Sequence, residues 1–106
     1  MLRAFVDQDL VRASACFAEE GVYRELRREP VRGRAAIAEH FAHFTASGVA
    51  WQFVLDDVIA AADRACVVYR FSLAEGQGRP GRERAGCAVV HLDARGQIAE
   101  WREYEG

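Results

Sequence analysis

The chain has 106 residues, of which 51% are hydrophobic, and its 14 basic and 16 acidic residues leave a formal net charge of −2. This length fits one globular core, so we expect a single domain over residues 1–106. The charge balance argues against a nucleic-acid-binding protein, which normally carries a basic face. No run approaches the roughly 18 apolar residues of a membrane span. The first residues do not resemble a signal peptide, so the sequence favours a cytoplasmic protein.

Residue types that bind metals are few and poorly spaced. The cysteines are odd in number and form no C-x-x-C motif, so we expect small buried thiols and no disulfide framework or zinc site. His40 and His43 are three residues apart in a predicted helix, a spacing that can present two ligands. However, Phe41 and Phe44 mark the buried face of that helix, which turns His43 towards solvent and leaves His40 at the edge. We therefore expect no metal and no cofactor. The cysteines are Cys16, Cys66 and Cys87.

The first half of the chain is predicted to be mainly helical. Apolar residues recur at steps of three and four from Leu2 to Phe17, which predicts an amphipathic helix over residues 2–18 that Gly21 stops. Pro30 prevents regular structure farther along. The elements expected next are a strand over 22–26, a polar loop over 27–33 and a second helix over 34–46.

The second half of the chain has the hydrophobic period of strands. From Trp51 onwards apolar and polar residues alternate, and turn-forming residues separate the alternating segments. Helices followed by consecutive strands predict an α+β fold, in which the helices pack on a strongly curved, mixed or antiparallel sheet. The expected strands cover residues 51–60, 64–73, 84–92 and 97–104.

Three segments, in this order and spacing, resemble the SnoaL-like branch of the nuclear-transport-factor-2-like (NTF2-like) superfamily. They are Phe17–Tyr23, Arg28–Ile37 and Trp101–Tyr104, and the resemblance covers nearly the whole chain. It implies a cone, in which a bent sheet wraps a long helix and opens on a mostly apolar pocket. It also implies a small apolar or amphipathic ligand and a homodimer formed through the sheet. Cys87 and Val89, on a strand apolar on both faces, would contribute to that interface.

The superfamily includes ketosteroid isomerases, limonene epoxide hydrolases and polyketide cyclases beside non-catalytic members, so the fold leaves the chemistry open. The resemblance to the isomerase places Glu25 at its catalytic base. The two oxyanion donors of the isomerase fall near Met1 and Ala88, so both donors are missing. A base without an oxyanion hole promotes little enolisation, which argues against steroid isomerisation. The alternative for Glu25 is a solvated side chain on an edge strand.

The resemblance to the hydrolase is strongest in the last expected strand. Its W-R-D-Y motif corresponds to Trp101–Tyr104, where Glu103 replaces the aspartate that positions a water molecule. Its R-x-D motif best matches Arg70-Phe71-Ser72, and a serine cannot protonate an epoxide oxygen as an acid does. The pair of carboxylates is therefore incomplete. An ion pair between Glu103 and Arg70 is the simpler interpretation.

Strand alternation decides which of these side chains face inwards. Trp101 and Glu103 share one face of the last strand. For residues 64–73 the two comparisons disagree: the hydrolase turns Arg70 and Ser72 inwards, whereas the isomerase turns Tyr69 and Phe71 inwards. We expect the larger apolar set to line the core. The residues expected around the pocket are Tyr23, Phe41, Trp51, Phe53, Tyr69, Arg70, Phe71 and Trp101, with Glu25 and Glu103 as candidate general bases.

Five arginines lie in and beside the predicted loop at 27–33. An anion could bind there, near the start of the second helix, but Glu25 and Glu29 are interleaved with the arginines, which favours a solvated loop of mixed charge. Three functions remain open: a domain that binds a small molecule, a cofactor-free isomerase, cyclase or hydrolase, and a non-catalytic interaction module. The arginines are Arg24, Arg27, Arg28, Arg32 and Arg34.

Overall fold

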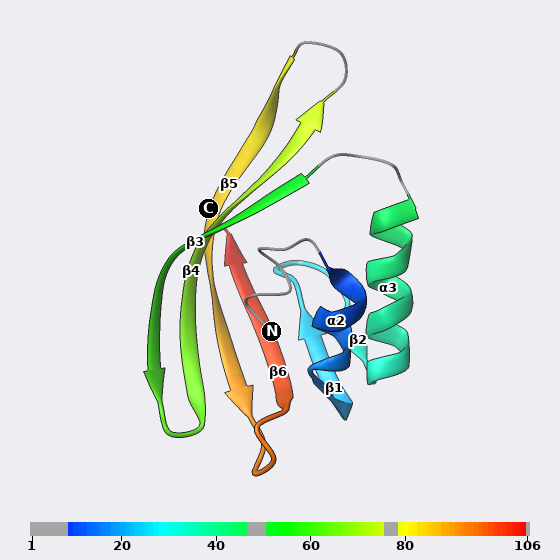
Figure 1. Ribbon diagram of the computed structural model, residues 1–106, viewed down its shortest axis with the longest axis vertical. Coiled ribbons are helices and arrows are strands. Elements are labelled where there is room, and N and C mark those ends of the chain that lie inside the picture. Colours follow the sequence, from blue (N-terminus) through cyan, green and yellow to red (C-terminus); the bar gives the residue numbers. More distant parts are fainter. Residues whose placement is uncertain (1–8, 47–50, 76–78, 106) are drawn as a thin grey trace.

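A computed structural model of the chain describes residues 9–46, 51–75 and 79–105. Two helices lie against one side of a six-stranded sheet that bends strongly and does not close (Figure 1). The predicted α+β class is confirmed. The elements are α2 (Leu10–Ala15), β1 (Phe17–Arg24), β2 (Val31–Arg32), α3 (Arg34–Ala46), β3 (Trp51–Ala61), β4 (Arg64–Glu75), β5 (Arg79–Leu92) and β6 (Ile98–Glu105).

The sheet has the strand order β2-β1-β6-β5-β4-β3. The last four strands are antiparallel neighbours in chain order, as the sequence predicts. Strand β1 instead runs parallel to β6, which makes the sheet mixed. In this pairing Tyr23 lies beside Trp101 and Arg24 beside Arg102. The end of the first strand therefore meets the last strand at the positions where the sequence places both candidate bases.

The second predicted helix is confirmed as α3, with the expected bounds. It follows Gly33, whose φ of 92° is in the left-handed region that favours glycine. The amide of Ile37 donates to the Gly33 carbonyl at 2.9 Å and closes the first turn. Ile37 and Phe41 are buried on one face, which fixes α3 against β1. Consequently His40, adjacent to Phe41, lies at the border between the core and solvent.

The first predicted helix is wrong beyond Ala15. Residues 2–8 of the predicted range lie outside the described residues, and α2 then begins after Asp9, whose carboxylate accepts from the Arg12 amide at 3.1 Å. The amide of Ile98 donates to the Cys16 carbonyl at 2.9 Å and brings the chain onto β6. Phe17 therefore opens a strand. The apolar spacing from Leu2 to Phe17 suggested one continuous helix because α2 and β1 bury their apolar residues, such as Ala13 and Phe17, in the same core.

Gly21 lies inside β1 and does not stop a helix. The pairing of β1 with β6 shifts between Phe17 and Val22, which marks a bulge. A Cβ at Gly21 would lie 2.9 Å from the Ile98 carbonyl oxygen, so only glycine permits this close approach. The strand predicted over 22–26 therefore begins earlier, at Phe17, and ends at Arg24.

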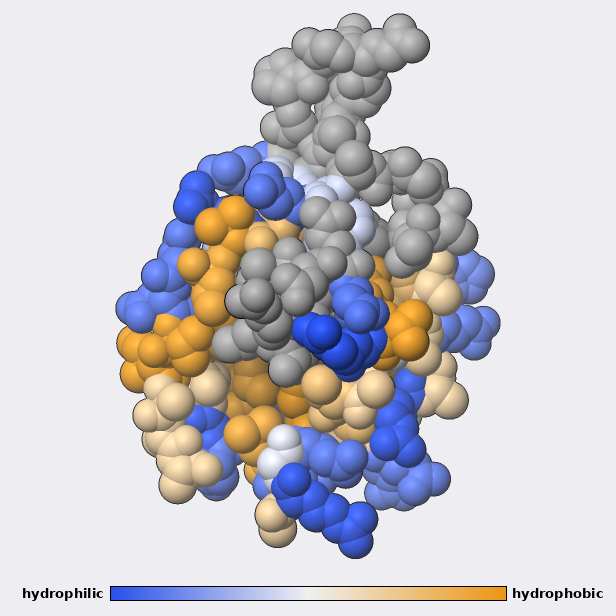
Figure 2. Space-filling model, viewed as in Figure 1, coloured by the Kyte–Doolittle hydropathy of each residue, from blue (hydrophilic) through white to orange (hydrophobic). Residues whose placement is uncertain are grey.

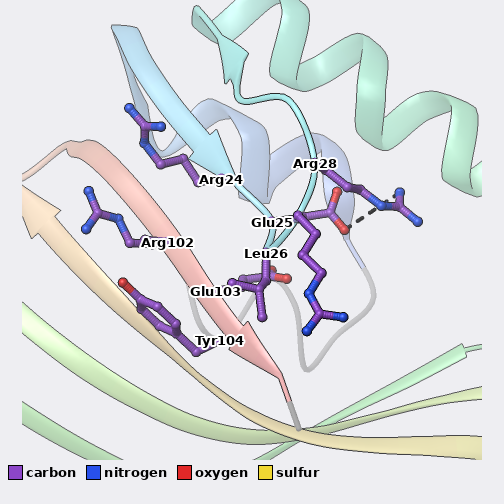
Figure 3. Close-up of a pocket in the computed structure, with 8 residues that line it drawn as sticks. Arg24, Glu25, Leu26, Arg28, Arg102, Glu103 and Tyr104 are labelled. Carbon is purple, nitrogen blue, oxygen red and sulfur yellow. Dashed lines mark ion pairs between the residues drawn. The ribbon is translucent and has the colours of Figure 1, made fainter.

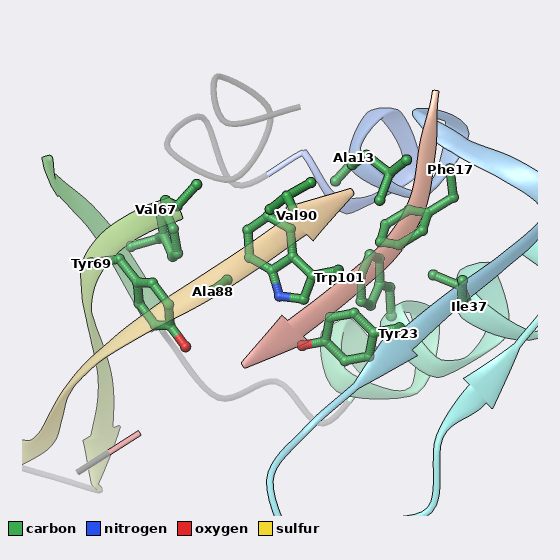
Figure 4. Packing of buried hydrophobic residues seen from close by; sticks show 12 residues of the cluster. Ala13, Phe17, Tyr23, Ile37, Val67, Tyr69, Ala88, Val90 and Trp101 are labelled. Carbon is green, nitrogen blue, oxygen red and sulfur yellow. The ribbon is translucent and has the colours of Figure 1, made fainter. Parts of the chain in front are cut away.

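The core lies between the concave face of the sheet and the helices (Figure 4). Val67 and Tyr69 of β4 are 1% and 2% exposed, which confirms that the larger apolar set of this strand faces inwards. In the space-filling view, hydrophobic side chains lie at the left of the face shown, below its centre and at the right, with hydrophilic ones around and between them (Figure 2). The buried hydrophobic residues are Ala13, Phe17, Tyr23, Ile37, Phe41, Phe53, Val67, Tyr69, Ala88, Val90, Ile98 and Trp101.

The opposite face of the sheet, here called the outer face, carries a second group of apolar side chains. Residues paired directly across antiparallel strands share a face, and the pairings connect this group through β3, β4, β5 and β6. Its two cysteines and two valines are all half-buried, so these cysteines are less buried than predicted. The group consists of Ile59, Cys66, Val68, Cys87, Val89 and Tyr104.

Candidate functional site

Glu103 is the most unusual ionisable residue of the concave face. The Tyr23 hydroxyl donates to its Oε1 at 2.7 Å, and the Trp101 indole Nε1 donates to the same oxygen at 2.8 Å. Within the part of the chain that the structure describes, no hydrogen bond reaches the other oxygen, Oε2. The carboxyl group is thus oriented through one oxygen, and the second is left for another partner.

Burial raises the pKa of Glu103 to about 7. The hydrogen bonds from Tyr23 and Trp101 act in the opposite direction, because they stabilise the carboxylate, while the negative charges of Glu25 and Glu105 raise the pKa further. Both donors are neutral, so they compensate for only part of the cost of burying a charge. Near neutral pH the residue therefore exists in its acidic and basic forms together.

The strand pairing explains how the two donors reach Glu103. Trp101 and Glu103 are two residues apart on β6 and point to the same face, and Tyr23 pairs with Trp101 across β1 and β6. Burial raises the pKa of Tyr23 well above its usual value, so its hydroxyl keeps the proton that it donates. In Figure 4 the Tyr23 hydroxyl and the Trp101 ring nitrogen point towards the same side of the core.

A second tyrosine extends the polar end of the core. The Tyr69 hydroxyl donates to Glu105 at 3.1 Å, and in Figure 4 the hydroxyls of Tyr69 and Tyr23 point towards the space between the two rings. Burial raises the pKa of Tyr69 as well, which keeps it protonated. Gly86 leaves room for it, since a Cβ there would lie 3.2 Å from the Tyr69 hydroxyl. Glu105 is also 3.4 Å from Arg84, so the network reaches the surface here.

Glu25 follows the end of β1 and turns towards α3. Its Oε1 is 3.1 Å from His40 Nε2, and its Oε2 is 3.9 Å from the Arg28 guanidinium. The His40 ring also packs against the Tyr23 ring, with 5.6 Å between centroids. Tyr23 thus contacts both carboxyl sites, through its hydroxyl for Glu103 and through its ring for the imidazole beside Glu25.

A hollow of about 180 Å³ lies between the segment that follows β1 and the neighbouring residues of β6 (Figure 3). In Figure 3, Leu26 and Glu103 lie in the middle, with Arg24, Arg102 and Tyr104 on one side and Glu25 and Arg28 on the other. The volume is below the roughly 300–1,000 Å³ of common ligand pockets. The hollow is thus large enough for a few water molecules or the polar end of a ligand. Its lining residues are Arg24, Glu25, Leu26, Arg27, Arg28, Arg102, Glu103 and Tyr104.

The structure brings most of the residues predicted for the pocket to the concave face. Tyr23, Phe41, Phe53, Tyr69 and Trp101 are all buried there. Tyr23 packs edge-on against Phe41 at 5.2 Å, and Phe53 stacks on Tyr69 at 5.1 Å. These aromatic rings therefore contact one another and form much of the core below the polar end. The two remaining aromatic residues, Trp51 and Phe71, are half-buried and stack at 5.9 Å.

Arg70 does not join this group. It alternates with Tyr69 on β4 and therefore lies on the outer face, where its Nε is 3.0 and 3.2 Å from the two carboxylate oxygens of Asp56. The ion pair expected between Arg70 and Glu103 is absent from the described residues, because the two side chains are on opposite faces of the sheet. Arg70 therefore matches the R-x-D motif of the hydrolase in sequence but does not lie at the candidate site.

His40 is the site residue that the sequence interpretation missed. It was considered only as a metal ligand beside His43, and His43 does point to solvent, with a side chain 80% exposed. Nothing local in the sequence links His40 to Glu25, because the contact depends on how α3 crosses the end of β1. Among residues 9–46, 51–75 and 79–105, no group of three or more His, Cys, Asp or Glu side chains is arranged to hold a metal ion.

The arginine loop is divided by the fold. Arg24 bonds Glu100 at 2.9 Å, and Arg102 bonds the other oxygen of the same carboxylate at 2.9 Å. Arg24, Arg27 and Arg28 line the hollow, whereas Arg32 and Arg34 do not. The mixed-charge interpretation of the loop is therefore closer to the structure than a convergent anion site. In the described part of the chain, no helix has the length and apolar character needed to cross a membrane.

Comparison with known proteins matches residues 1–101 to the family model of the SnoaL-like domain. No curated protein matches the chain significantly in sequence. Among solved structures, an LEH-like epoxide hydrolase of M. tuberculosis superposes with a TM-score of 0.80 at 21% identity, over 99% of this chain and 76% of that chain. SalBIII, described as an epoxide hydrolase/cyclase-like enzyme in pyran ring formation in salinomycin, gives 0.81 at 17% identity, over 99% and 84%.

An NTF2-like protein of unknown function from Cytophaga hutchinsonii is equally similar. Its TM-score is 0.81 at 14% identity, over 98% of this chain and 91% of that chain. At these identities the likeness concerns the fold. Proteins with described enzymatic activity and a protein of unknown function thus have the same architecture, so the chemistry must be argued from the residues of this chain.

Proposed function

The chain belongs to the SnoaL-like domain family, and we propose that it binds a small amphipathic molecule and acts on it with Glu103 as general base. The observation that carries this proposal is the carboxyl group of Glu103, held through one oxygen by Tyr23 and Trp101. A general base needs a fixed position and a pKa near the working pH. Glu103 has both.

Activation of water suits this geometry better than enolisation. Oε1 accepts from two donors, whereas Oε2 accepts no hydrogen bond within the described residues, so a water molecule bound at Oε2 could lose a proton while it attacks an electrophilic carbon. Enolisation would need two acidic donors around a developing oxyanion, and the positions for them fell near Met1 and Ala88. We therefore propose epoxide opening by water or by an internal hydroxyl. Two of the similar structures, an LEH-like epoxide hydrolase and the epoxide hydrolase/cyclase-like SalBIII, are consistent with this class of reaction.

The aromatic core and the polar hollow support an amphipathic ligand. Tyr23 and Trp101 connect the two regions, because their rings lie in the core and their polar atoms face Glu103. The apolar part of a ligand would contact aromatic rings, and its reactive end would lie beside Glu103. Trp51, Phe53 and Phe71 would then set the length and shape that the site accepts.

A comparison of two glutamine variants on one strand tests the proposal. Wild type, Glu103→Gln and Glu100→Gln are assayed for diol formation from a panel of linear and cyclic aliphatic epoxides. We expect Glu103→Gln to lower kcat/KM by about 10²–10⁴-fold, the usual contribution of a general base, and Glu100→Gln to leave it nearly unchanged. Since Glu103 has a pKa of about 7, the wild-type rate should rise with pH through neutrality. Full activity of Glu103→Gln would refute the proposal.

We further propose a homodimer formed through the outer face of the sheet. Its apolar group, defined above, spans four strands, and Ile59 is 64% exposed and Tyr104 42% exposed. An isologous dimer would cover both copies of this surface. Light scattering of the 11.8 kDa chain should give about twice the monomer mass, and Ile59→Asp should return the monomer. A wild-type monomer at high concentration would contradict the dimer.

A cytoplasmic location remains part of the proposal. The support is that all three cysteines, including the neighbouring Cys66 and Cys87, are free thiols, a state favoured in reducing compartments. Fractionation of cells that produce the chain tests it, and recovery from a secreted or membrane fraction would oppose it.

A further inference from the structure

A second ionisable pair lies beside Glu103 and has no role in the base mechanism. His40 Nε2 is 3.1 Å from Glu25 Oε1, and both side chains are only partly exposed, at 36% and 27%. Glu25 lines the same hollow as Glu103, and the two carboxyl groups are close enough for the charge of one to raise the pKa of the other. The pair therefore belongs to the same polar end of the core.

We propose that His40 is the general acid of this site and that Glu25 positions it. The inference rests on the proposed function, because it assigns the proton donor for the reaction in which Glu103 is the base. Epoxide opening needs such a donor, since the ring oxygen leaves as an alkoxide unless it is protonated. A carboxylate and an imidazole would here share the work for which the resemblance leads one to expect two carboxylates.

The position of Tyr23 supports a common site. Its hydroxyl bonds Glu103 at 2.7 Å, and its ring lies against the His40 ring with 5.6 Å between centroids. One buried side chain thus separates the proposed base from the proposed acid. A substrate oxygen on the His40 side of Tyr23 would receive a proton from His40. A water molecule on the Glu103 side would lose a proton to Glu103.

The proton balance of the proposed step is complete without a further reactant. Glu103 accepts a proton from water as the water oxygen bonds to the ring carbon. The carbon–oxygen bond of the epoxide breaks, and the protonated imidazole of His40 gives its proton to the leaving oxygen. The products are the diol, a protonated Glu103 and a neutral His40. Proton exchange with solvent, at the hollow for Glu103 and at the exposed part of the ring for His40, then restores both residues.

The groups that face His40 suit an acid. Glu25 is its partner from the segment after β1, and Arg28 is 3.9 Å from the other oxygen of Glu25. On its own helix, Glu39 is 3.8 Å from His43, one turn away. Glu25 therefore holds the imidazole of His40 through one ring nitrogen, and the ring stays beside Tyr23, where it could donate a proton to a ligand.

The pair is not needed to hold the fold. Helix α3 is fixed by Ile37 and Phe41, which are 0% and 5% exposed. A partly exposed ion pair contributes little stability, so a substitution at His40 should leave the protein folded. His43 provides a matched control because it lies on the same helix, has a glutamate neighbour of its own and is 80% exposed.

The test compares pH profiles of kcat/KM for wild type, His40→Gln and His43→Gln. We expect His40→Gln to lower the rate near neutral pH by about 10²-fold, as for loss of a general acid, and to remove the fall of the rate at high pH. His43→Gln should match wild type. Epoxides whose leaving oxygen is stabilised by an electron-withdrawing group need less protonation, so they should lose less with His40→Gln.

Glu25→Gln separates positioning from proton donation. The amide can still hold the imidazole in place, so Glu25→Gln should lower the maximal rate less than His40→Gln does. An equal loss at all pH values and for all epoxides with His40→Gln, or no difference from His43→Gln, would overturn the proposal. If Glu103→Gln remains active, the proposed function itself fails. If only Glu103→Gln is inactive, Glu103 stands as base and the role of His40 falls.

Discussion

Strand β6 carries two glutamates with opposite electrostatic surroundings on its two sides. Glu103 is buried on the concave side and accepts hydrogen bonds from two neutral groups, so burial raises its pKa to about 7. Glu100 is also partly buried, and burial opposes its charge, but the hydrogen bond from Arg24 and the charge of Arg102 outweigh this and lower its pKa. The two carboxyl groups are three residues apart, and the deeper burial of Glu103 together with the charged partners of Glu100 makes the difference.

This contrast separates a residue suited to chemistry from one suited to structure. A carboxylate held by two guanidinium groups stays ionised and has no reason to take up a proton at neutral pH. A carboxyl group held by a phenol and an indole changes its charge in that range. The same distinction holds between Glu103 and Asp56, which bonds Arg70 on the outer face. The inner and outer faces can thus be told apart by the charge of the donors.

The largest expected effect comes from Trp101→Ala on the inner face. Trp101 is 1% exposed, and removal of a buried tryptophan leaves a cavity that costs about 3–5 kcal/mol. The variant also loses a donor to Glu103. Urea denaturation measures the loss, and Arg102→Ala, its exposed neighbour, is the control and should change the midpoint little. Comparable losses for both variants would break the contrast between the faces.

The extent to which the sequence predicted the fold follows from how local the signals are. The helix over 34–46 was predicted correctly because its apolar period lies within it and Gly33 directly precedes it, and strands β3 to β6 follow from alternation and turns. The end of the first helix was misplaced because a contact distant in the chain makes Phe17 part of a strand. The Ile98 amide of β6 donates to the Cys16 carbonyl directly before Phe17. Gly21 was misread for the same reason, since its role is contact with Ile98.

The second effect concerns how stability depends on pH. The pKa of Glu103 is raised from 4.5 to about 7, so the folded state binds its proton more tightly than the unfolded state. That contribution is complete below pH 4.5 and is lost as pH rises through 7, which amounts to roughly 3 kcal/mol. Glu103→Gln should remove this loss, so its stability relative to wild type increases from pH 4 to pH 8. Parallel curves in urea titrations at these pH values would contradict it.

A smaller effect is expected for Tyr23→Phe. The hydroxyl bond to Glu103 favours the carboxylate, so without it the pKa of Glu103 should rise above about 7. Stability should fall by about 1 kcal/mol, the usual net value of a hydrogen bond. Carbon NMR of the glutamate carboxyl groups measures the pKa. Tyr104→Phe on the outer face is the control and should leave it unchanged, and an unchanged pKa in Tyr23→Phe would show that the bond does not tune Glu103.

The site was predicted in part, and the errors again have a physical cause. Glu103, Trp101 and Tyr23 were identified through motif resemblance and alternation, because one strand fixes which residues share a face. Arg70 was expected in the pocket because of its match to the R-x-D motif, but side chains alternate along β4, and with Tyr69 facing inwards Arg70 faces outwards. His40 was missed because its partner comes from another element. Residue spacing predicts neighbours within a strand or helix, whereas contacts between α3 and the end of β1 depend on packing.

The smallest effect should come from Glu100→Gln, and its sign should be opposite to that of Glu103→Gln. The pKa of Glu100 is lowered in the folded protein, so its contribution to stability is present above the unfolded pKa near 4.5 and is lost as the pH falls through the folded value. Glu100→Gln should therefore be slightly less stable than wild type at pH 7 and approach it at pH 3. Its side chain is 21% exposed, and those of its partners Arg24 and Arg102 are 35% and 46% exposed, so screening keeps the difference small and added salt should reduce it further. With rising pH, the stability relative to wild type should therefore increase for Glu103→Gln and decrease for Glu100→Gln, although the two positions are three residues apart. If the stability of both variants relative to wild type changed with pH in the same direction, the charges of Arg24 and Arg102 would not explain the difference between Glu100 and Glu103.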